Sequence, residues 1–149
     1  MTHSTYVEDP KQKFDQFELL RFYIDRAMKT KKPVYILTMS RENYLHPEQI
    51  AEKFRNIPGI YDSLQVNGTI DFITSGSEDE VSEIAKRLHT ETGEPIGCVK
   101  YDGDNMINFY VTLKNAISIT RKQNKPWHLY RPEEDSLQAL IQKARSKDN

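Results

Sequence analysis

The sequence predicts an α+β fold built around an antiparallel sheet, because strand patterns and helix patterns alternate along the chain. Residues 34–39 and 107–113 are apolar segments of strand length. Asn67-Gly68, between two further strand-like segments, is a strong hairpin signal. The capping-box pattern S-x-x-E at Ser77 precedes an amphipathic helical pattern.

Length and composition fit one ordinary domain. The chain has 149 residues, of which 37% are hydrophobic and 29% charged, and a chain of this length can bury a core without disulfides or metals. We interpret residues 1–10 as a polar N-terminal tail and residues 11–149 as a single α+β domain. The tail lacks the basic and apolar regions of a signal peptide, and Cys98 is the single cysteine, so we expect a cytoplasmic protein.

The first half of the domain is predicted as helix, strand and helix. Residues 11–29 carry apolar residues at helical spacing, and Pro33 prevents the helix from continuing. Because the apolar stripe is wide, this helix either packs deeply on its own core or shares one side with another subunit, which allows a homodimer. Residues 34–39 form a buried strand, and a helix that begins at Pro47 ends before Pro58.

Two registers are available to the predicted hairpin. A two-residue loop at Asn67-Gly68 places Leu64 opposite Asp71, which mixes apolar and polar residues on each face. A bulged turn over residues 66–68 instead pairs Leu64 with Ile70. We prefer the bulged turn because it separates an apolar face from a polar one. The polar face, expected to be solvated or to form an interface, carries Ser63, Gln65, Thr69 and Asp71.

The second half is predicted as a helix, two strands and a final helix. The helix after Ser77 is closed by Gly93. Residues 95–101 and 106–113 are interpreted as a strand pair around a turn, and a last helix starts near Glu133. The predicted order of elements is therefore α-β-α-β-β-α-β-β-α. The alternating apolar residues of the second strand, which we expect on the core side, are Ile107, Phe109, Val111 and Leu113.

The block from residue 34 to residue 101 has the order β-α-β-β-α-β and resembles the ferredoxin-like plait. We therefore expect a ferredoxin-like, plait-type antiparallel sheet (β-α-β-β-α-β-β) with N-terminal and C-terminal helices. VYILTM at residues 34–39 is similar to the first-strand motif of RNA-recognition modules, and this resemblance implies that Tyr35 stacks on a base. Where those modules have aromatic residues on their third strand, this chain has Thr69 and Asp71.

A second resemblance rests on a shorter motif. Asn56-Ile57-Pro58-Gly59-Ile60 is similar to a segment of small regulatory domains with the same topology. Those domains dimerise through their sheets and hold amino acids or similar effectors at the interface. The resemblance implies a small-ligand-sensing dimer.

The most polarised part of the chain extends from residue 105 to residue 132, which contains no acidic residue. Lysine and arginine neutralise phosphates or carboxylates, while aromatic rings stack on bases or fill a partner's pocket. Because Pro126 and Pro132 indicate a loop, we interpret this segment as a binding site; alternatively, its aromatic residues pin a connection onto the core. Together with Tyr35, the predicted binding residues are Lys114, Arg121, Lys122, Lys125, Trp127, His128, Tyr130 and Arg131.

The sequence contains no catalytic or metal-binding motif among the common ones. It lacks G-x-S-x-G, a Walker loop, H-E-x-x-H and paired cysteines. Asp102 and Asp104 alternate within a turn but lack the rest of a calcium loop. We therefore predict no cofactor and no metal, and favour a protein that is not an enzyme. For an enzyme, His128 with Arg131 and Lys122 would be the first candidates, for phosphate-ester chemistry.

These observations predict a non-enzymatic binding or regulatory domain that acts on a macromolecule through the basic and aromatic segment. The net charge of -1 favours a protein partner over a nucleic acid, because a polynucleotide is repelled by an acidic surface. Two alternatives remain: RNA or DNA binding by a plait that is similar to RNA-recognition modules, and the small-ligand-sensing dimer. No segment is long and apolar enough to predict a membrane span.

Overall fold

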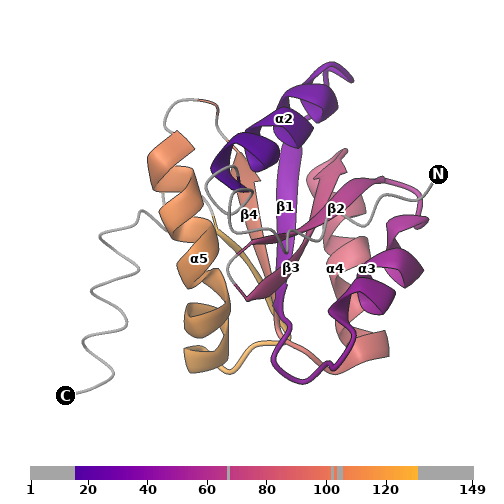
Figure 1. The fold of residues 1–149 in the computed structure, drawn as a ribbon, viewed down its shortest axis with the longest axis vertical. Helices are drawn as coiled ribbons and strands as arrows, with labels where there is room; N and C mark the ends of the chain where they lie inside the picture. The colour runs from indigo at the N-terminus through magenta and orange to yellow at the C-terminus, as the bar shows by residue number, and fades with distance from the viewer. Residues whose placement is uncertain (1–15, 67, 102, 104–105, 131–149) are drawn as a thin grey trace.

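The computed structural model describes residues 16–66, 68–101, 103 and 106–130. Within these residues the chain forms four helices and five strands, shown in Figure 1. The helices are α2 (Gln16–Met28), α3 (Pro47–Arg55), α4 (Glu78–Thr92) and α5 (Met106–Lys122). The strands are β1 (Val34–Ser40), β2 (Ile60–Val66), β3 (Thr69–Ser75), β4 (Ile96–Tyr101) and β5 (Trp127–Tyr130). The α+β class is confirmed; the predicted N-terminal tail and the final helix near Glu133 lie outside the described residues.

The strands form one sheet in the order β2-β3-β1-β4-β5. β1 lies antiparallel to β3 and to β4, and β2 lies antiparallel to β3. β5 is parallel to β4. The sheet is therefore mixed, and the prediction of a wholly antiparallel sheet is wrong at β5.

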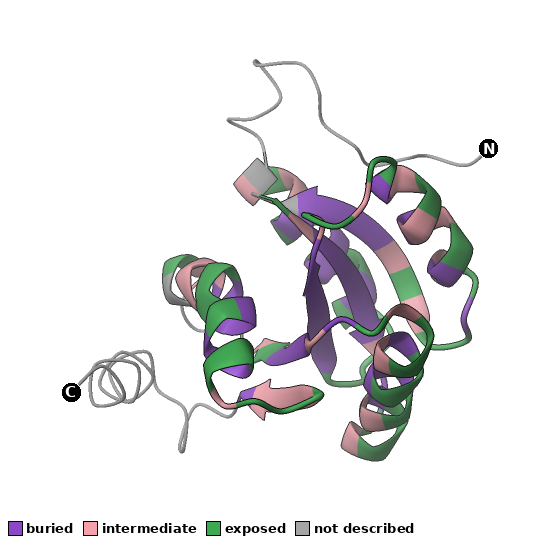
Figure 2. Ribbon diagram, turned by 90° about the horizontal axis from the view of Figure 1, so that it is seen from below, coloured by how far each residue is buried: buried purple, intermediate pink, exposed green. Residues whose placement is uncertain are grey.

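Both faces of the sheet are covered by helices. All seven residues of β1 are buried, and their side chains alternate between two core clusters. Val34 and Ile36 belong to one cluster with residues of α2 and α5, while Leu37 and Met39 belong to the other with residues of α3 and α4. Figure 2 shows the buried strands between helices whose outer sides are exposed. The result is a three-layer arrangement of helices, sheet and helices.

The segment predicted as a second strand of the last pair, residues 106–113, is the first half of α5. The alternation of apolar residues over this short window suggested a strand, but the window was too short. Phe109, Leu113, Ala116 and Thr120 are all buried at helical spacing. Ile107, which the strand prediction placed in the core, is 67% exposed.

A close approach between α5 and β4 lets the helix lie directly on the sheet. A Cβ atom added to Gly97 of β4 would stand 2.9 Å from Cβ of Ala116 on α5 and 3.2 Å from Cγ2 of Thr38 on β1. At 2.9 Å the helix or the strand would have to shift, because Cβ atoms in proteins essentially never approach so closely. The absence of a side chain at residue 97 therefore sets the distance between this helix and the sheet.

The hairpin adopts the register that the sequence analysis rejected. Val66 pairs with Thr69 and Leu64 with Asp71, so the loop has two residues. Gly68 has a φ of +82°, in the left-handed region that favours glycine. The bulge lies at the other end of β2, between Ile60 and Asp62. The prediction failed because it assumed one open, polar face, whereas in the three-layer structure both faces are covered.

The polar residues expected on an open face are instead mostly buried. Ser63, Gln65 and Asp71 are at most 5% exposed. Since side chains of directly paired residues point to the same face, Ser63 and Gln65 share the α3 and α4 side with their partners Phe72 and Ile70. Asp71 lies on the opposite side.

The capping box that opens α4 is confirmed. The backbone N–H of Glu80 donates to Oγ of Ser77 at 3.2 Å, and the backbone N–H of Ser77 donates to Oε1 of Glu80 at 3.0 Å. At the other end, Gly93 has a φ of +75° and its N–H donates to the carbonyl of His89. Cys98 is buried in the core, and burial raises the pKa of its thiol. None of the helices in the described part of the chain is long and apolar enough to cross a membrane.

The close approach at Gly97 predicts a specific coupling. Gly97→Ala should lower the free energy of unfolding by about 1–3 kcal/mol through overpacking against α5. Combining it with Ala116→Gly removes the facing methyl group, so the loss in the double variant should be smaller than the sum of the two single losses. Chemical denaturation of the four proteins measures this cycle. Strict additivity would show that the two positions do not touch.

The capping box predicts a pH dependence. The backbone N–H and the hydroxyl of Ser77 hold the pKa of Glu80 below its ordinary value of 4.5. A lowered pKa in the folded state means that ionised Glu80 stabilises the fold above pH 4.5, and that this contribution disappears as the pH falls through the folded-state pKa. The difference in unfolding free energy between the native chain and Glu80→Gln should therefore shrink on acidification. A difference independent of pH would contradict this account.

Candidate interaction surface

The exposed side of α5 gathers most of the predicted cations. Lys114, Arg121 and Lys122 are exposed on the helix, and Lys125 is exposed in the turn that follows it. Lys114 and Arg121 are seven residues apart, which is two helical turns, so they share one line along the helix. We call the exposed residues Lys114, Arg121, Lys122 and Lys125 the basic face.

The amphipathic pattern of α5 directs the basic face toward solvent. Its buried stripe faces β4 and β1, while the side opposite that stripe carries Lys114, Ser118 and Lys122. The sequence from residue 106 to residue 130 contains no acidic residue. Arg121 and Lys122 lie in the last turn, where the negative end of the helix dipole favours cations. The same residues that stabilise the end of the helix therefore supply the positive charge of its surface.

Contacts with neighbouring groups orient Lys114 and Arg121. Nζ of Lys114 lies 5.7 Å from the centre of the Tyr110 ring, within cation-π range. Nη1 of Arg121 lies 3.9 Å from Oε2 of Glu42 in the loop after β1. Both partners of this ion pair are substantially exposed, so its contribution to stability is small. The sequence offered no signal for the pair, because its members are far apart in the chain.

Trp127, His128 and Tyr130 were predicted to lie in a loop, but they form β5. Trp127 and Leu129 pack against the cluster on the α4 side. Tyr130 belongs to the cluster on the α5 side. The rings of His128 and Tyr130 meet edge to face, with their centres 4.5 Å apart. Trp127, His128 and Leu129 are half-buried. The strand therefore combines core packing with partial exposure.

Tyr130 is a core residue rather than a surface contact. It is 2% exposed, and its hydroxyl donates to the carbonyl of Ala116 at 2.7 Å. The hydroxyl of Thr120 lies 2.7 Å from the same hydroxyl. These bonds hold β5 against α5. For Tyr130 the structure therefore agrees with the alternative interpretation, in which aromatic residues of this segment pin the chain onto the core.

Tyr35 is also buried, with 2% of its surface exposed. Its ring belongs to the cluster formed with α3 and α4, whereas base-stacking residues of RNA-recognition modules lie on a face left open by the helices. The ring thus points away from the position that the resemblance implied. Arg131 lies outside the described residues.

The sequence analysis did not predict that Asp71, on the α5 side of the sheet, would be a buried polar residue. Asp71 is fully buried, and Oδ2 accepts a hydrogen bond of 2.7 Å from the hydroxyl of Thr69. Burial, and then the charge of Asp71, raises the pKa of Tyr110 on α5. Within the described residues, no three His, Cys, Asp or Glu side chains are placed to hold a metal ion.

Comparison with models of known protein families finds no match, and comparison with curated proteins finds none either.

The bonds of Tyr130 predict a loss of stability when its hydroxyl is removed. Tyr130→Phe should lower the free energy of unfolding by about 1–2 kcal/mol, because a buried hydrogen-bond donor to Ala116 is lost. Tyr101→Phe is the matched control: Tyr101 is half-buried, makes a ring contact with Phe109 and has no hydroxyl bond with another described residue. Chemical denaturation compares the two variants. Equal effects would contradict the assigned role of the Tyr130 hydroxyl.

Proposed function

We propose that this protein is a non-enzymatic binding or regulatory domain that engages the acidic surface of another protein through the basic face. The observation that carries the proposal is an exposed row of cations on a helix without any acidic residue. Long-range attraction by such a row speeds association and selects acidic partners. The chain as a whole is close to neutral, with a net charge of -1, so the attraction is confined to this surface.

The charges of the cations exceed the partial charge of the helix end, so this surface has a net positive potential. The negative end of a helix dipole amounts to about half an elementary charge. Arg121, Lys122 and Lys125 place three full positive charges around that end, so the cations outweigh the dipole. Glu42 neutralises part of the charge of Arg121. Lys122 and Lys125 are exposed as well, and with Arg121 they make up the positive charge at the end of the helix.

A protein partner is favoured over a nucleic acid by the covering of the sheet. Single-stranded RNA and DNA obtain much of their binding energy by stacking bases on exposed aromatic rings. Tyr35 and Tyr130 are buried, which removes two of the predicted stacking residues from the surface. The small-ligand-sensing dimer is disfavoured for a related reason, because the polar sheet face that it would use is covered.

We further infer that β1, α3, β2, β3, α4 and β4 form a plait of the ferredoxin-like type. The antiparallel pairing in the order β2-β3-β1-β4 and the packing of α3 and α4 on one face support this assignment. β5 and the helices α2 and α5 are then additions that cover the second face and extend one edge.

The proposed function predicts selective, charge-dependent binding. A fluorescent peptide in which glutamate alternates with valine should bind the full chain, and its affinity should fall as salt is added. Lys122→Glu with Lys125→Glu should weaken binding by roughly tenfold or more. Lys29→Glu with Lys86→Glu, which changes the charge equally at exposed positions outside α5 and the turn that follows it, should have little effect. Fluorescence anisotropy measures each affinity.

Two outcomes would overturn the proposal. Absence of binding by the acidic peptide at low salt would contradict the proposed role of the basic face. Tighter binding of a single-stranded oligonucleotide of equal charge would assign the surface to nucleic acid instead.

A further inference from the structure

We propose that the partner supplies an extended acidic segment, which adds to the sheet as a new strand beside β5. This inference rests on the proposed function and specifies how the acidic partner is held. In this mode main-chain hydrogen bonds provide affinity, and alternate side chains provide specificity.

The hydrogen bonds between β4 and β5 determine which groups of β5 face outward. The backbone N–H of Ile96 donates to the carbonyl of Pro126 at 2.9 Å, and Ile96 is paired with Trp127. In a parallel pair of strands, a residue such as Ile96 does not bond to its paired residue Trp127. It bonds instead to the residues before and after that partner, Pro126 and His128. His128 and Tyr130 therefore direct their backbone groups toward β4. The N–H and C=O groups of Trp127 and Leu129 point to the other side.

That other side is an edge of the described sheet. β5 is the last strand in the order, and no strand among the described residues lies beyond it. An edge strand presents its outward N–H and C=O groups as a template for pairing. Trp127 and Leu129, which carry these groups, are half-buried rather than buried. A short partner strand could pair with the two residues.

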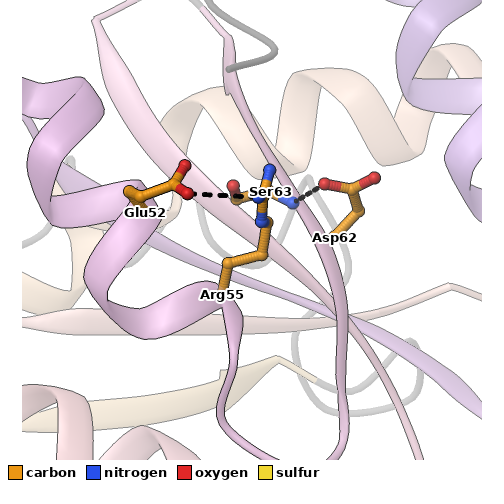
Figure 3. A network of polar contacts seen from close by, with 4 residues as sticks. All are labelled: Glu52, Arg55, Asp62 and Ser63. Carbon is orange, nitrogen blue, oxygen red and sulfur yellow. Dashed lines mark hydrogen bonds and ion pairs between the residues drawn. The ribbon is translucent and has the colours of Figure 1, made fainter. Parts of the chain in front are cut away.

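The opposite edge of the sheet provides an internal comparison. Ser63, Leu64 and Gln65 of β2 are at most 5% exposed although β2 is also the last strand on its side. Figure 3 shows Glu52 and Arg55 of α3 at this edge, beside Asp62 and Ser63. Arg55 bonds to Glu52 at 3.3 Å and is itself largely buried. The β2 edge is therefore covered, and the β5 edge is the better candidate for strand addition.

Charge complementarity defines the chemistry of the added strand. α5 ends at Lys122, and Lys125 lies two residues before β5 begins, so both cations stand at the start of this edge. Side chains of an added strand alternate between the α5 side and the α4 side of the sheet. Residues directed to the α5 side would approach the basic face, and residues directed to the α4 side would extend the apolar surface of Trp127 and Leu129. The expected segment alternates acidic with apolar residues.

The test uses three versions of the peptide in which glutamate alternates with valine. N-methylation of alternate residues removes the N–H groups from one side of an extended peptide only. One version is methylated at all valines and another at all glutamates, so the two carry the same number of methyl groups. Strand addition predicts that one version loses affinity by roughly tenfold or more and the other binds much like the parent, because only one set of N–H groups faces β5.

Amide spectra of the full chain locate the peptide independently. Strand addition predicts that the N–H groups of Trp127 and Leu129 show the largest shifts and gain protection from hydrogen exchange. If the parent peptide binds, both methylated versions bind equally well and the shifts are confined to α5, strand addition is wrong while the proposed function stands. If the parent peptide does not bind at all, the proposed function itself fails.

Discussion

The direct contact of α5 with β4 is the constraint on which the rest of this structure depends. It is possible because residue 97 has no side chain and residue 116 has a small one. With the helix seated there, the chain leaves its C-terminal end and returns within four residues to form β5 beside β4. The buried hydroxyls of Thr120 and Tyr130 then join strand to helix. The same placement turns Lys114 and Lys122 outward.

Coverage of both sheet faces explains the distribution of polar residues. In a two-layer fold Asp71 would lie on a solvated face, whereas here it is buried opposite Thr38 and Leu64. Oγ1 of Thr38 has no hydrogen-bond partner within the described part of the chain. Buried polar groups are costly unless they are satisfied, and Oδ2 of Asp71 is satisfied by the hydroxyl of Thr69. The polar residues of β1 and β3 on this face are buried because α2 and α5 cover it.

The sequence correctly predicted those elements that are determined by local signals. The capping box at Ser77, the helix that starts at Pro47 and the buried strand β1 were all predicted from short-range chemistry. α5 was missed because Ile107, Phe109, Val111 and Leu113 also satisfy a period of two, and only the longer stretch to Thr120 distinguishes a helix. The hairpin register depends on whether both faces are covered, which is a tertiary property that no local pattern contains.

The candidate surface was predicted only in part for the same reason. Charge composition alone was enough to single out Lys114, Arg121, Lys122 and Lys125. It did not indicate that Tyr130 would be buried, because an aromatic ring in a basic segment serves a core as readily as a surface. The edge formed by β5 was hidden by Pro126, which suggested a loop although it stands just before the strand.

The contact between α5 and β4 can be observed directly by nuclear Overhauser spectroscopy on the native chain. Direct contact of α5 with β4 predicts a strong cross-peak between the α-protons of Gly97 and the methyl protons of Ala116, together with helical cross-peaks throughout residues 106–122. Extended-strand cross-peaks at residues 107–113, with no signal between Gly97 and Ala116, would contradict it.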